Sequence, residues 1–266
     1  MLKQRILTAV LLAPIVLAII WYGNEQVFSL FASLLAFLIA YEWCQIVRPS
    51  KINSLIISLA IAISIALFNY ASFIVIDVGR ILIASVVLWL ICFFWLFKPE
   101  AGKDKMTSKY ALAVGIIMLF GASLISVHQI TEQGAKLTLV LFLLVWVADI
   151  GAYVAGKSFG KHKLAKKVSP GKTLEGMLGG LILTSIYGYF VAIWLGQEWL
   201  YFVLAFPLIT AISVVGDLFA SLLKRQANIK DSGFLLPGHG GFLDRFDSLI
   251  AATPFYFAFI HYFYIS

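Results

Sequence analysis

The sequence predicts an all-α, polytopic integral membrane protein, and three observations lead to this fold class. Hydrophobic residues make up 62% of the 266 residues and charged residues only 12%, whereas a soluble globular domain has roughly 45–50% and about 25%. The mean hydropathy is +0.97, and one soluble core could not bury so much apolar surface. The apolar residues form continuous runs, and a chain in lipid must satisfy its own backbone hydrogen bonds, which favours helices.

The apolar runs define the elements. A helix that crosses about 30 Å of hydrocarbon needs roughly 17–25 apolar residues. The first run follows Lys3 and Arg5 as in a signal peptide, but no small-residue cleavage pattern ends it, so we predict a retained helix. Nine spans are predicted, at about residues 6–22, 27–47, 53–76, 81–97, 110–130, 137–156, 176–196, 199–221 and 248–265.

Lysine and arginine residues predict the orientation, because cytoplasmic loops of membrane proteins are enriched in them. With nine spans and a cytoplasmic N-terminus, 18 of the 20 basic residues face the cytoplasm, and only Arg80 and Lys136 lie outside. The C-terminus is then outside. This rule accounts for the net charge of +7, so no nucleic-acid partner is expected. Cys44 and Cys92 lie in apolar runs, which argues against disulfides or a thiolate metal site.

The chain divides into two expected parts. Residues 1–136 hold about five helices, whose role as packing elements, lipid portal or dimer contact stays open. Residues 137–266 hold about four helices and the two long cytoplasmic loops, near 157–175 and 222–247, in which the polar residues are concentrated. We expect the chemistry in this second part.

Three carboxylates, those of Glu42, Asp149 and Asp217, fall inside predicted spans. In the predicted topology each lies roughly 6–11 Å below the cytoplasmic boundary, at 1.5 Å per residue. Ionisable groups inside a membrane are costly and point to function by default. Structural roles stay open: Glu42 could cap a helix end or extend to the interface, and Asp149 could bond Tyr153 in a stretch of small residues that favours close helix packing.

The segment after Asp217 combines acidic and basic groups. Asp217, Ser221 and Lys224 lie at helical spacing, with Arg225 beside them, and so share one face. A flexible Pro237-Gly-His239-Gly-Gly241 stretch follows, and then Asp244 and Asp247 begin a new helix. Oxygen-only carboxylates favour a hard cation such as Mg²⁺. The neighbouring lysine and arginine side chains are suited to phosphates.

The other loop ends in Ser169-Pro-Gly-Lys172-Thr173 ahead of a helix. Gly-Lys-Thr resembles the end of a P-loop, but Lys166 occupies the position of the upstream glycine. Backbone N–H groups and Lys172 could still cradle a phosphate. Lys166 and Lys167 could instead hold anionic lipid headgroups.

The motifs resemble one enzyme family. The run Ser221-x-Leu-Lys224-Arg225-x4-Lys230-Asp231-x-Gly233-x2-Leu236-Pro237-x-His239-Gly240-Gly241-Phe-x-Asp244-Arg245-Phe-Asp247 looks like the full signature of the CDP-diacylglycerol synthases, or phosphatidate cytidylyltransferases. Trp146-x2-Asp149-x2-Ala152-Tyr153 and Ser169-Pro-Gly-Lys172-Thr173-x-Glu175-Gly176 also resemble that family. The strong resemblance covers roughly residues 140–250, and the first five spans match only in general character.

The resemblance implies a membrane enzyme that converts CTP and phosphatidic acid into CDP-diacylglycerol and pyrophosphate. It implies Mg²⁺ as cofactor, with Mn²⁺ as a substitute, and a homodimer. The short chain without an organelle presequence suggests a bacterial inner membrane. By motif position, the metal carboxylates would be Asp217, Asp244 and Asp247, with Asp149 as a further candidate; the phosphate-binding cations would be Lys224, Arg225, Lys230 and Arg245; and the nucleotide-facing residues would be Ser169, Lys172 and Thr173. His239 would orient a phosphate, protonate pyrophosphate, or serve only the loop structure.

Other functions predict different features. A polyprenol or archaeal-lipid CTP-transferase, or a CTP-dependent lipid kinase, would share this build and differ in the lipid acceptor. A CDP-alcohol phosphotransferase would carry an Asp-Gly-x2-Ala-Arg-x8-Gly-x3-Asp-x3-Asp run, which the sequence lacks. An ion-coupled transporter would place its charges near the midplane, whereas the predicted polar set is on one side.

Overall fold

The computed structural model describes residues 13–47, 50–70, 77–130, 132–233 and 240–265. A helix covers Ala13–Tyr22. The later elements are α2 (Glu25–Val47), α3 (Lys51–Tyr70), α4 (Val78–Leu96), α5 (Met106–Gln129), α6 (Gly134–Phe159), β1 (Lys163–Ala165), β2 (Ser169–Thr173), α7 (Leu174–Leu195), α8 (Trp199–Gln226), α9 (Leu243–Ile260) and a π-helical end, η1 (His261–Ile265).

The fold is all-α and multi-pass, as the sequence predicts. Within the described ranges, six helices are long and apolar enough to cross a membrane, namely α2, α4, α5, α6, α7 and α8. Ala13–Tyr22 and the Lys51–Leu67 part of α3 are shorter apolar helices. α9 begins at Leu243, ahead of the predicted span at 248, and its first turns carry charged residues. The count of nine spans and the orientation of the termini stay predictions.

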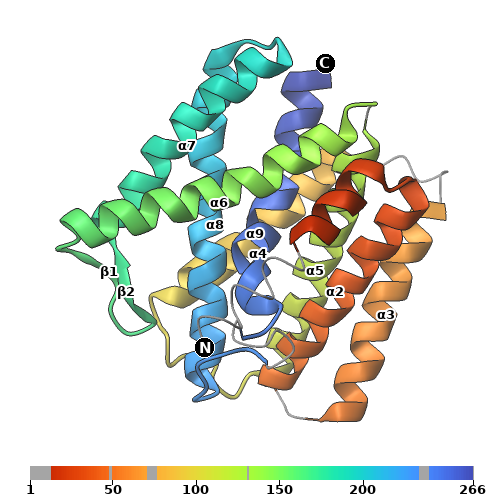
Figure 1. Ribbon diagram of the computed structural model, residues 1–266. Coiled ribbons are helices and arrows are strands. Elements are labelled where there is room, and N and C mark those ends of the chain that lie inside the picture. Colours follow the sequence, from red (N-terminus) through yellow and green to blue (C-terminus); the bar gives the residue numbers. More distant parts are fainter. Residues whose placement is uncertain (1–12, 48–49, 71–76, 131, 234–239, 266) are drawn as a thin grey trace.

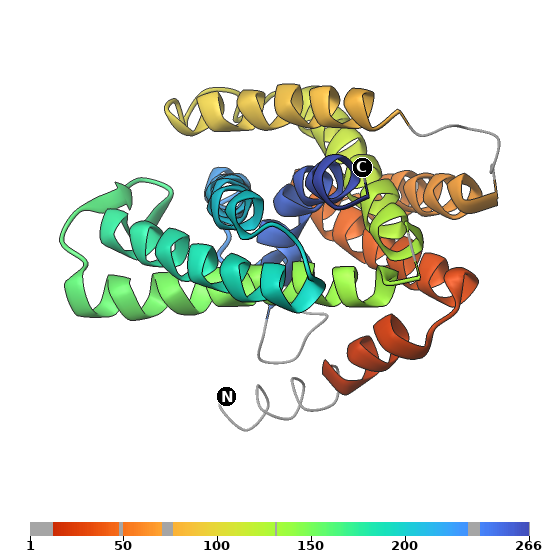
Figure 2. The same cartoon turned by 90° about the horizontal axis from the view of Figure 1, so that it is seen from above.

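The helices pack in two groups that share α9. In the first group, α2 packs against α3 and α5. In the second group, α6 packs against α7, α7 against α8, and α8 against α9, and α6 also contacts α9. α9 contacts α5 as well as α8. Figure 1 shows α6 running across the molecule beside α7 and α8, with α2 and α3 on the other side. Figure 2 shows α9 between α4 and α6, so α9 lies near the centre of the bundle.

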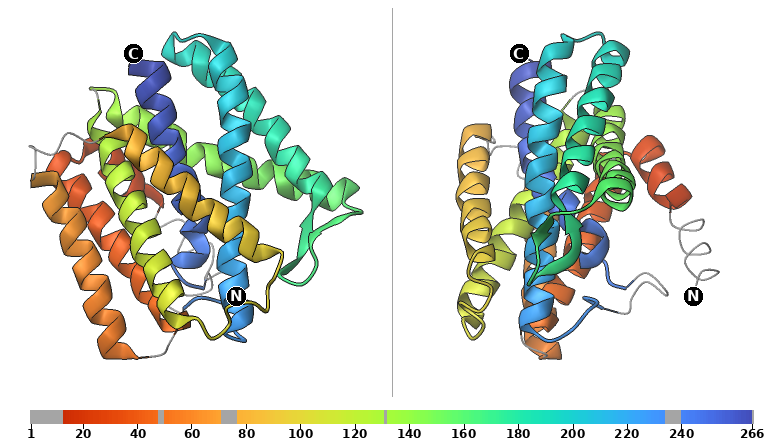
Figure 3. Two further views of the ribbon diagram at one scale, coloured as in Figure 1. Left: turned by 180° about the vertical axis from the view of Figure 1, so that it is seen from behind. Right: turned by 90° about the vertical axis from the view of Figure 1, so that its left-hand side faces the viewer.

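A short antiparallel hairpin replaces the loop expected before α7. Lys163 pairs with Thr173 and Ala165 with Ser169, and Figure 3 shows the hairpin projecting beyond the adjoining ends of α6 and α7. The Thr173 hydroxyl accepts a hydrogen bond from Gly176 N at 3.1 Å, which caps α7. The Glu175 carboxylate accepts from Lys161 N at 3.1 Å and contacts His162 Nδ1 at 2.6 Å. The hairpin is therefore anchored at its base.

Small residues let α6 and α7 approach closely, as the sequence predicts. A Cβ built on Gly179 would overlap the Cβ of Ala155 and stand 2.8 Å from Gly151 O. A Cβ on Gly151 would stand 3.1 Å from Gly180 Cα. In a membrane, van der Waals contact of this kind supplies much of the association between helices. The contact fixes α6 relative to the strand that precedes α7.

Gly179→Val tests this packing. The added methyl groups have no free space against Ala155 and Gly151, so we expect unfolding to become easier by about 1–3 kcal/mol. The thermal unfolding midpoint of the detergent-purified protein, followed by tryptophan fluorescence, measures the change. Gly171→Ala is the matched control, because no atom lies within 4 Å of its built Cβ. Equal midpoints for the two variants would contradict the packing role.

Candidate functional site: carboxylates and lysines between the hairpin, α8 and α9

The centre of the candidate site is an ion pair between two elements. Lys172, on β2, places its Nζ against Asp217 Oδ2, on α8. Ser221, one turn further along α8, lies 3.5 Å from Asp217 Oδ1 through its hydroxyl. The spacing predicted from the sequence thus puts Ser221 beside Asp217, and the hairpin brings Lys172 to the same place.

Close backbone packing brings α9 to this ion pair. A Cβ on Gly216 would stand 2.5 Å from Asp247 O and 2.7 Å from the Cβ of Ala251. Only a glycine at this position lets α8 and α9 approach so closely. The residue after it, Asp217, therefore lies near the start of α9.

Three carboxylates share this region. The charge of Asp217 repels those of Asp149, on α6, and Asp247, on α9, while Lys172 attracts both. Asp247 is only 9% exposed. Arg245 adds a favourable interaction with Asp149, and Lys224 adds one with Asp247. Three elements far apart in the sequence thus gather like charges that need cations between them.

Asp244 has a different environment from the other carboxylates. Its Oδ1 accepts from Lys224 Nζ at 2.5 Å, and its Oδ2 accepts from Ser232 N at 2.7 Å and Gly241 N at 3.1 Å. The side chains of Lys224 and Asp244 are 13% and 8% exposed. Asp244 therefore joins α8, the start of α9 and the segment between them. Its three donors are one lysine side chain and two backbone N–H groups.

Carboxylate oxygens are the ligands that a hard cation prefers. Among the described residues, however, no three metal-ligating side chains cluster tightly. Mg²⁺ commonly takes one or two protein carboxylates, with waters and substrate phosphates as its other ligands. Asp217 and Asp247 lie on the closely packed helices α8 and α9 and fit such a site. Asp149, like Asp247, interacts with the charges of Asp217 and Lys172. Asp244 fits less well, because three donors already occupy its oxygens.

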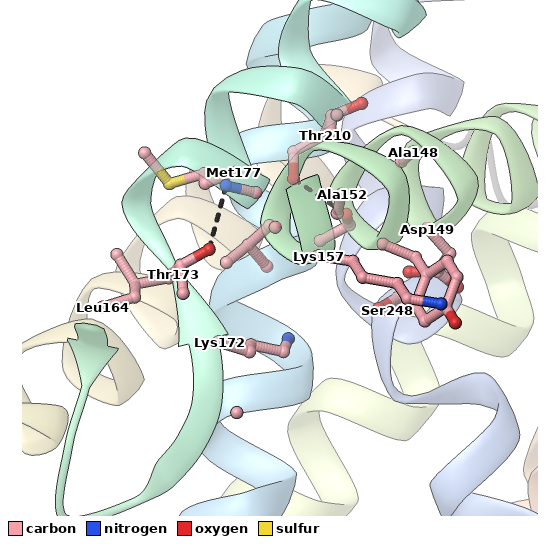
Figure 4. A pocket seen from close by; sticks show the side chains of 17 residues that line it. Ala148, Asp149, Ala152, Lys157, Leu164, Lys172, Thr173, Met177, Thr210 and Ser248 are labelled. Atoms are coloured by element: carbon pink, nitrogen blue, oxygen red, sulfur yellow. Dashed lines mark hydrogen bonds between the residues drawn. The ribbon is translucent and has the colours of Figure 1, made fainter. Parts of the chain in front are cut away.

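A cavity of about 290 Å³ opens beside these charges. Its polar lining includes Asp149, Lys157, Lys172, Thr173 and Ser248, from α6, β2 and α9 (Figure 4). Its apolar lining includes Ala148, Ala152, Met177 and Val214, from α6, α7 and α8. A ligand with a charged head and an apolar body matches this division.

The remaining predicted residues take several positions. Ser169 pairs with Ala165 inside the hairpin, and Thr173 caps α7 while also lining the cavity. Arg225 donates from Nε to Val168 O at 3.3 Å and links α8 to the hairpin. Lys230 is exposed beyond the end of α8. His239 lies outside the described residues.

The site also includes residues that the sequence analysis did not select. Lys157 and Ser248 line the cavity, and Ser232 donates its backbone N–H to Asp244. Ser248 directly follows a predicted site residue, Asp247, and Lys157 lies in the basic loop, so sequence proximity was an available signal for both. Ser232 lies inside the signature, between Asp231 and Gly233, but its bond to Asp244 depends on the path of the chain between α8 and α9.

Comparison with known proteins identifies the family. The model of the cytidylyltransferase family matches residues 3–263. The chain belongs to this family. The phosphatidate cytidylyltransferase of Haemophilus influenzae is 35% identical, over 99% of both chains. That of Pseudomonas aeruginosa is 38% identical over 97% of this chain and 96% of its own, and that of Bacillus subtilis is 32% identical over 95% of each. The family match covers the first five helices as well as the motif region.

Asp217→Asn tests the centre of the site. The change removes the charge that pairs with Lys172 and would hold a cation, so we expect turnover to fall by at least about 10²–10³-fold, as when a charge-stabilising group is lost. The side chains of Lys172 and Asp217 are 28% and 27% exposed, so water can partly solvate the unpaired lysine, and the thermal midpoint should fall by less than it would for a fully buried pair. Steady-state product formation measures the effect, and Asp244→Asn is expected to be equally inactive.

Asp104→Asn is the matched control for that loss of charge, because Asp104 is exposed in the turn before α5. It should keep wild-type turnover. Wild-type rates in both Asp217→Asn and Asp244→Asn would remove these residues from the site.

Proposed function

We propose that this cytidylyltransferase transfers CMP from CTP to phosphatidic acid, giving CDP-diacylglycerol and pyrophosphate for phospholipid synthesis. The observation that carries the proposal is the cluster of Lys172, Asp217, Asp149 and Asp247, of which Asp149 and Lys172 line a cavity with polar and apolar sides. The relatives that match over nearly the whole chain carry the name of this activity.

The cavity suits the lipid substrate. Phosphatidic acid has a phosphomonoester head and two acyl chains. Lys157 and Lys172 can attract the head, while Met177 and Val214 face the apolar body. Because α6 and α7 carry many exposed apolar side chains, acyl chains can extend from the cavity into the surrounding lipid. The lipid would then react without leaving the membrane.

The reaction needs positioning and charge neutralisation more than a strong base. An oxygen of the phosphatidate head attacks the α-phosphorus of CTP, forming a new P–O bond, while the bond from the α-phosphorus to the bridging oxygen breaks and pyrophosphate leaves. The head is already an anion, so no difficult proton removal is required. Lys172, Lys224 and Arg245 would offset the charge of two polyanions and of the transferring group; their positions beside Asp217, Asp244 and Asp149 support this role.

Mg²⁺, or Mn²⁺ in its place, is the cofactor we propose. Asp217 and Asp247 would hold it, with Asp149 nearby, and when bound it would neutralise phosphate oxygens. Asp244 instead positions Lys224. Ser169, Thr173, Lys230 and His239 complete the proposed nucleotide-facing set, with Arg225 holding the hairpin beside it.

The membrane arrangement is also part of the proposal. Nine spans would cross the bacterial inner membrane, with the N-terminus in the cytoplasm and the C-terminus outside. Residues 1–136 would supply packing and the contacts of a homodimer, and residues 137–266 the catalytic region. In this orientation the site opens to the cytoplasm, where CTP is available.

A product assay tests the function. The purified protein is mixed with labelled CTP, phosphatidic acid and Mg²⁺, and lipid-extractable label and pyrophosphate are followed together. We expect equal amounts of both products, and the loss of both on addition of EDTA. The Asp217→Asn protein serves as the inactive control. If folded protein moves no label into phosphatidic acid, the proposed acceptor is wrong, and label entering a polyprenyl phosphate would identify the rival acceptor.

Cysteine labelling tests the orientation. Lys136→Cys and Lys166→Cys are made in a Cys44→Ala, Cys92→Ala background, since both native cysteines are free and buried. A membrane-impermeant maleimide should label Lys136→Cys in intact spheroplasts and Lys166→Cys only in inverted vesicles. Arg80→Cys should behave like Lys136→Cys. The reverse pattern would contradict the proposed topology.

A further inference from the structure

Glu42, on α2, connects the first part of the chain to the segment that carries the family signature. Its side chain is 3% exposed. Its Oε2 accepts from Ser232 Oγ at 2.8 Å and from Leu243 N at 2.9 Å, across 190 and 201 residues of sequence. Of the two structural roles that the sequence left open, the contact with Leu243 N is a helix cap, but the capped helix is α9 and not the helix that carries Glu42.

The contact with Leu243 caps α9 from another helix. The first N–H groups of a helix have no partner within it, and a negative charge there is favourable. The N-cap residue of α9, Phe242, makes no side-chain capping bond. Glu42 therefore satisfies a backbone donor that the local sequence leaves without a side-chain cap.

The surrounding chain leaves no room for another side chain. A Cβ on Gly233 would stand 2.6 Å from Glu42 Oε1, and a Cβ on Gly241 would overlap Glu42 Oε2 and Ser232 Oγ. Both glycines belong to the signature, so part of its glycine pattern serves to accommodate Glu42. Oε1 makes no hydrogen bond to any residue that the structure describes.

Ser232 continues the connection toward the site. Its hydroxyl donates to Glu42 and its backbone N–H donates to Asp244 Oδ2 at 2.7 Å. Asp244 Oδ1 in turn holds Lys224 Nζ at 2.5 Å. A continuous series of contacts thus runs from α2 through Ser232 and Asp244 to a phosphate-binding lysine on α8.

We infer that Glu42 is a positioning residue for nucleotidyl transfer: by holding Ser232 and the start of α9, it sets the geometry of Asp244 and Lys224. The inference rests on the proposed function and adds a residue of the first five helices to the machinery of that reaction. Glu42 is not among the described residues that line the cavity, so its effect on turnover passes through the two residues that it holds.

Glu42→Ala, Glu42→Gln and Ser232→Ala test the inference. Misplacing a reactive group by about 1 Å costs up to about 10²-fold, so we expect Glu42→Ala to lower kcat by about 10–100-fold. The KM for phosphatidate should change by less than about threefold, because the cavity residues are untouched. Glu42→Gln keeps an acceptor oxygen and should restore most of kcat, and Ser232→Ala should lower kcat less than Glu42→Ala.

Hydrogen exchange supplies a readout that does not depend on activity. Peptides covering Gly241 to Ser248 should exchange faster in Glu42→Ala than in the wild type, because Leu243 N loses its acceptor and Asp244, which accepts from Gly241 N, is no longer held in place through Ser232. Ser33→Ala is the matched control: Ser33 is also buried on α2, but its hydroxyl bonds Ser29 O within the same helix. It should leave both kcat and exchange unchanged.

The outcomes separate the inference from the proposed function. Unchanged exchange in Glu42→Ala, or faster exchange with wild-type kcat, overturns the positioning role while transfer by the wild type stands. Glu42→Gln as slow as Glu42→Ala also overturns it, because acceptor geometry would then be irrelevant. If Glu42→Ala does not fold, wild-type kcat in Ser232→Ala overturns the role. Wild-type protein that makes no CDP-diacylglycerol overturns the proposed function, and the positioning role with it.

Discussion

The structure depends on pairing charges that a lipid-surrounded protein would otherwise bury alone. An unpaired buried charge costs several kcal/mol, so its partner must be present and well placed. Lys172 with Asp217, and Lys224 with Asp244, meet this need by joining the hairpin, α8 and α9. The hairpin must therefore reach α8, and α9 must begin near the end of α8. The same charges make the region attractive to phosphates and to a cation.

Glycine makes these approaches sterically possible. Gly216 lets α8 pack against the backbone at the start of α9, and Gly179 does the same between α6 and α7. The first contact brings Asp217 toward Asp247, and the second fixes the strand that carries Lys172. In lipid, close packing of this kind also contributes to helix association. Stability and site geometry thus rest on the same contacts.

The first five helices are tied to the site by specific polar contacts as well as by apolar packing. Glu42 holds Ser232 and Leu243. At the end of α8, Gln226 Nε2 donates to Pro99 O at 2.7 Å, in the turn after α4. Hydrogen bonds with few competing partners are well suited to fix one arrangement of helices in an apolar surrounding. The two parts of the chain therefore act on one geometry.

The sequence alone determined the all-α membrane class, the helix positions and the motif residues, because hydropathy and residue spacing are local properties. Tertiary structure decided what depends on contacts between residues: the hairpin in place of a loop, the early start of α9, and the three donors that bond Asp244. Glu42 shows the difference most clearly. Its depth was readable from the sequence, but its partners lie 190 and 201 residues away, and only folding brings them together.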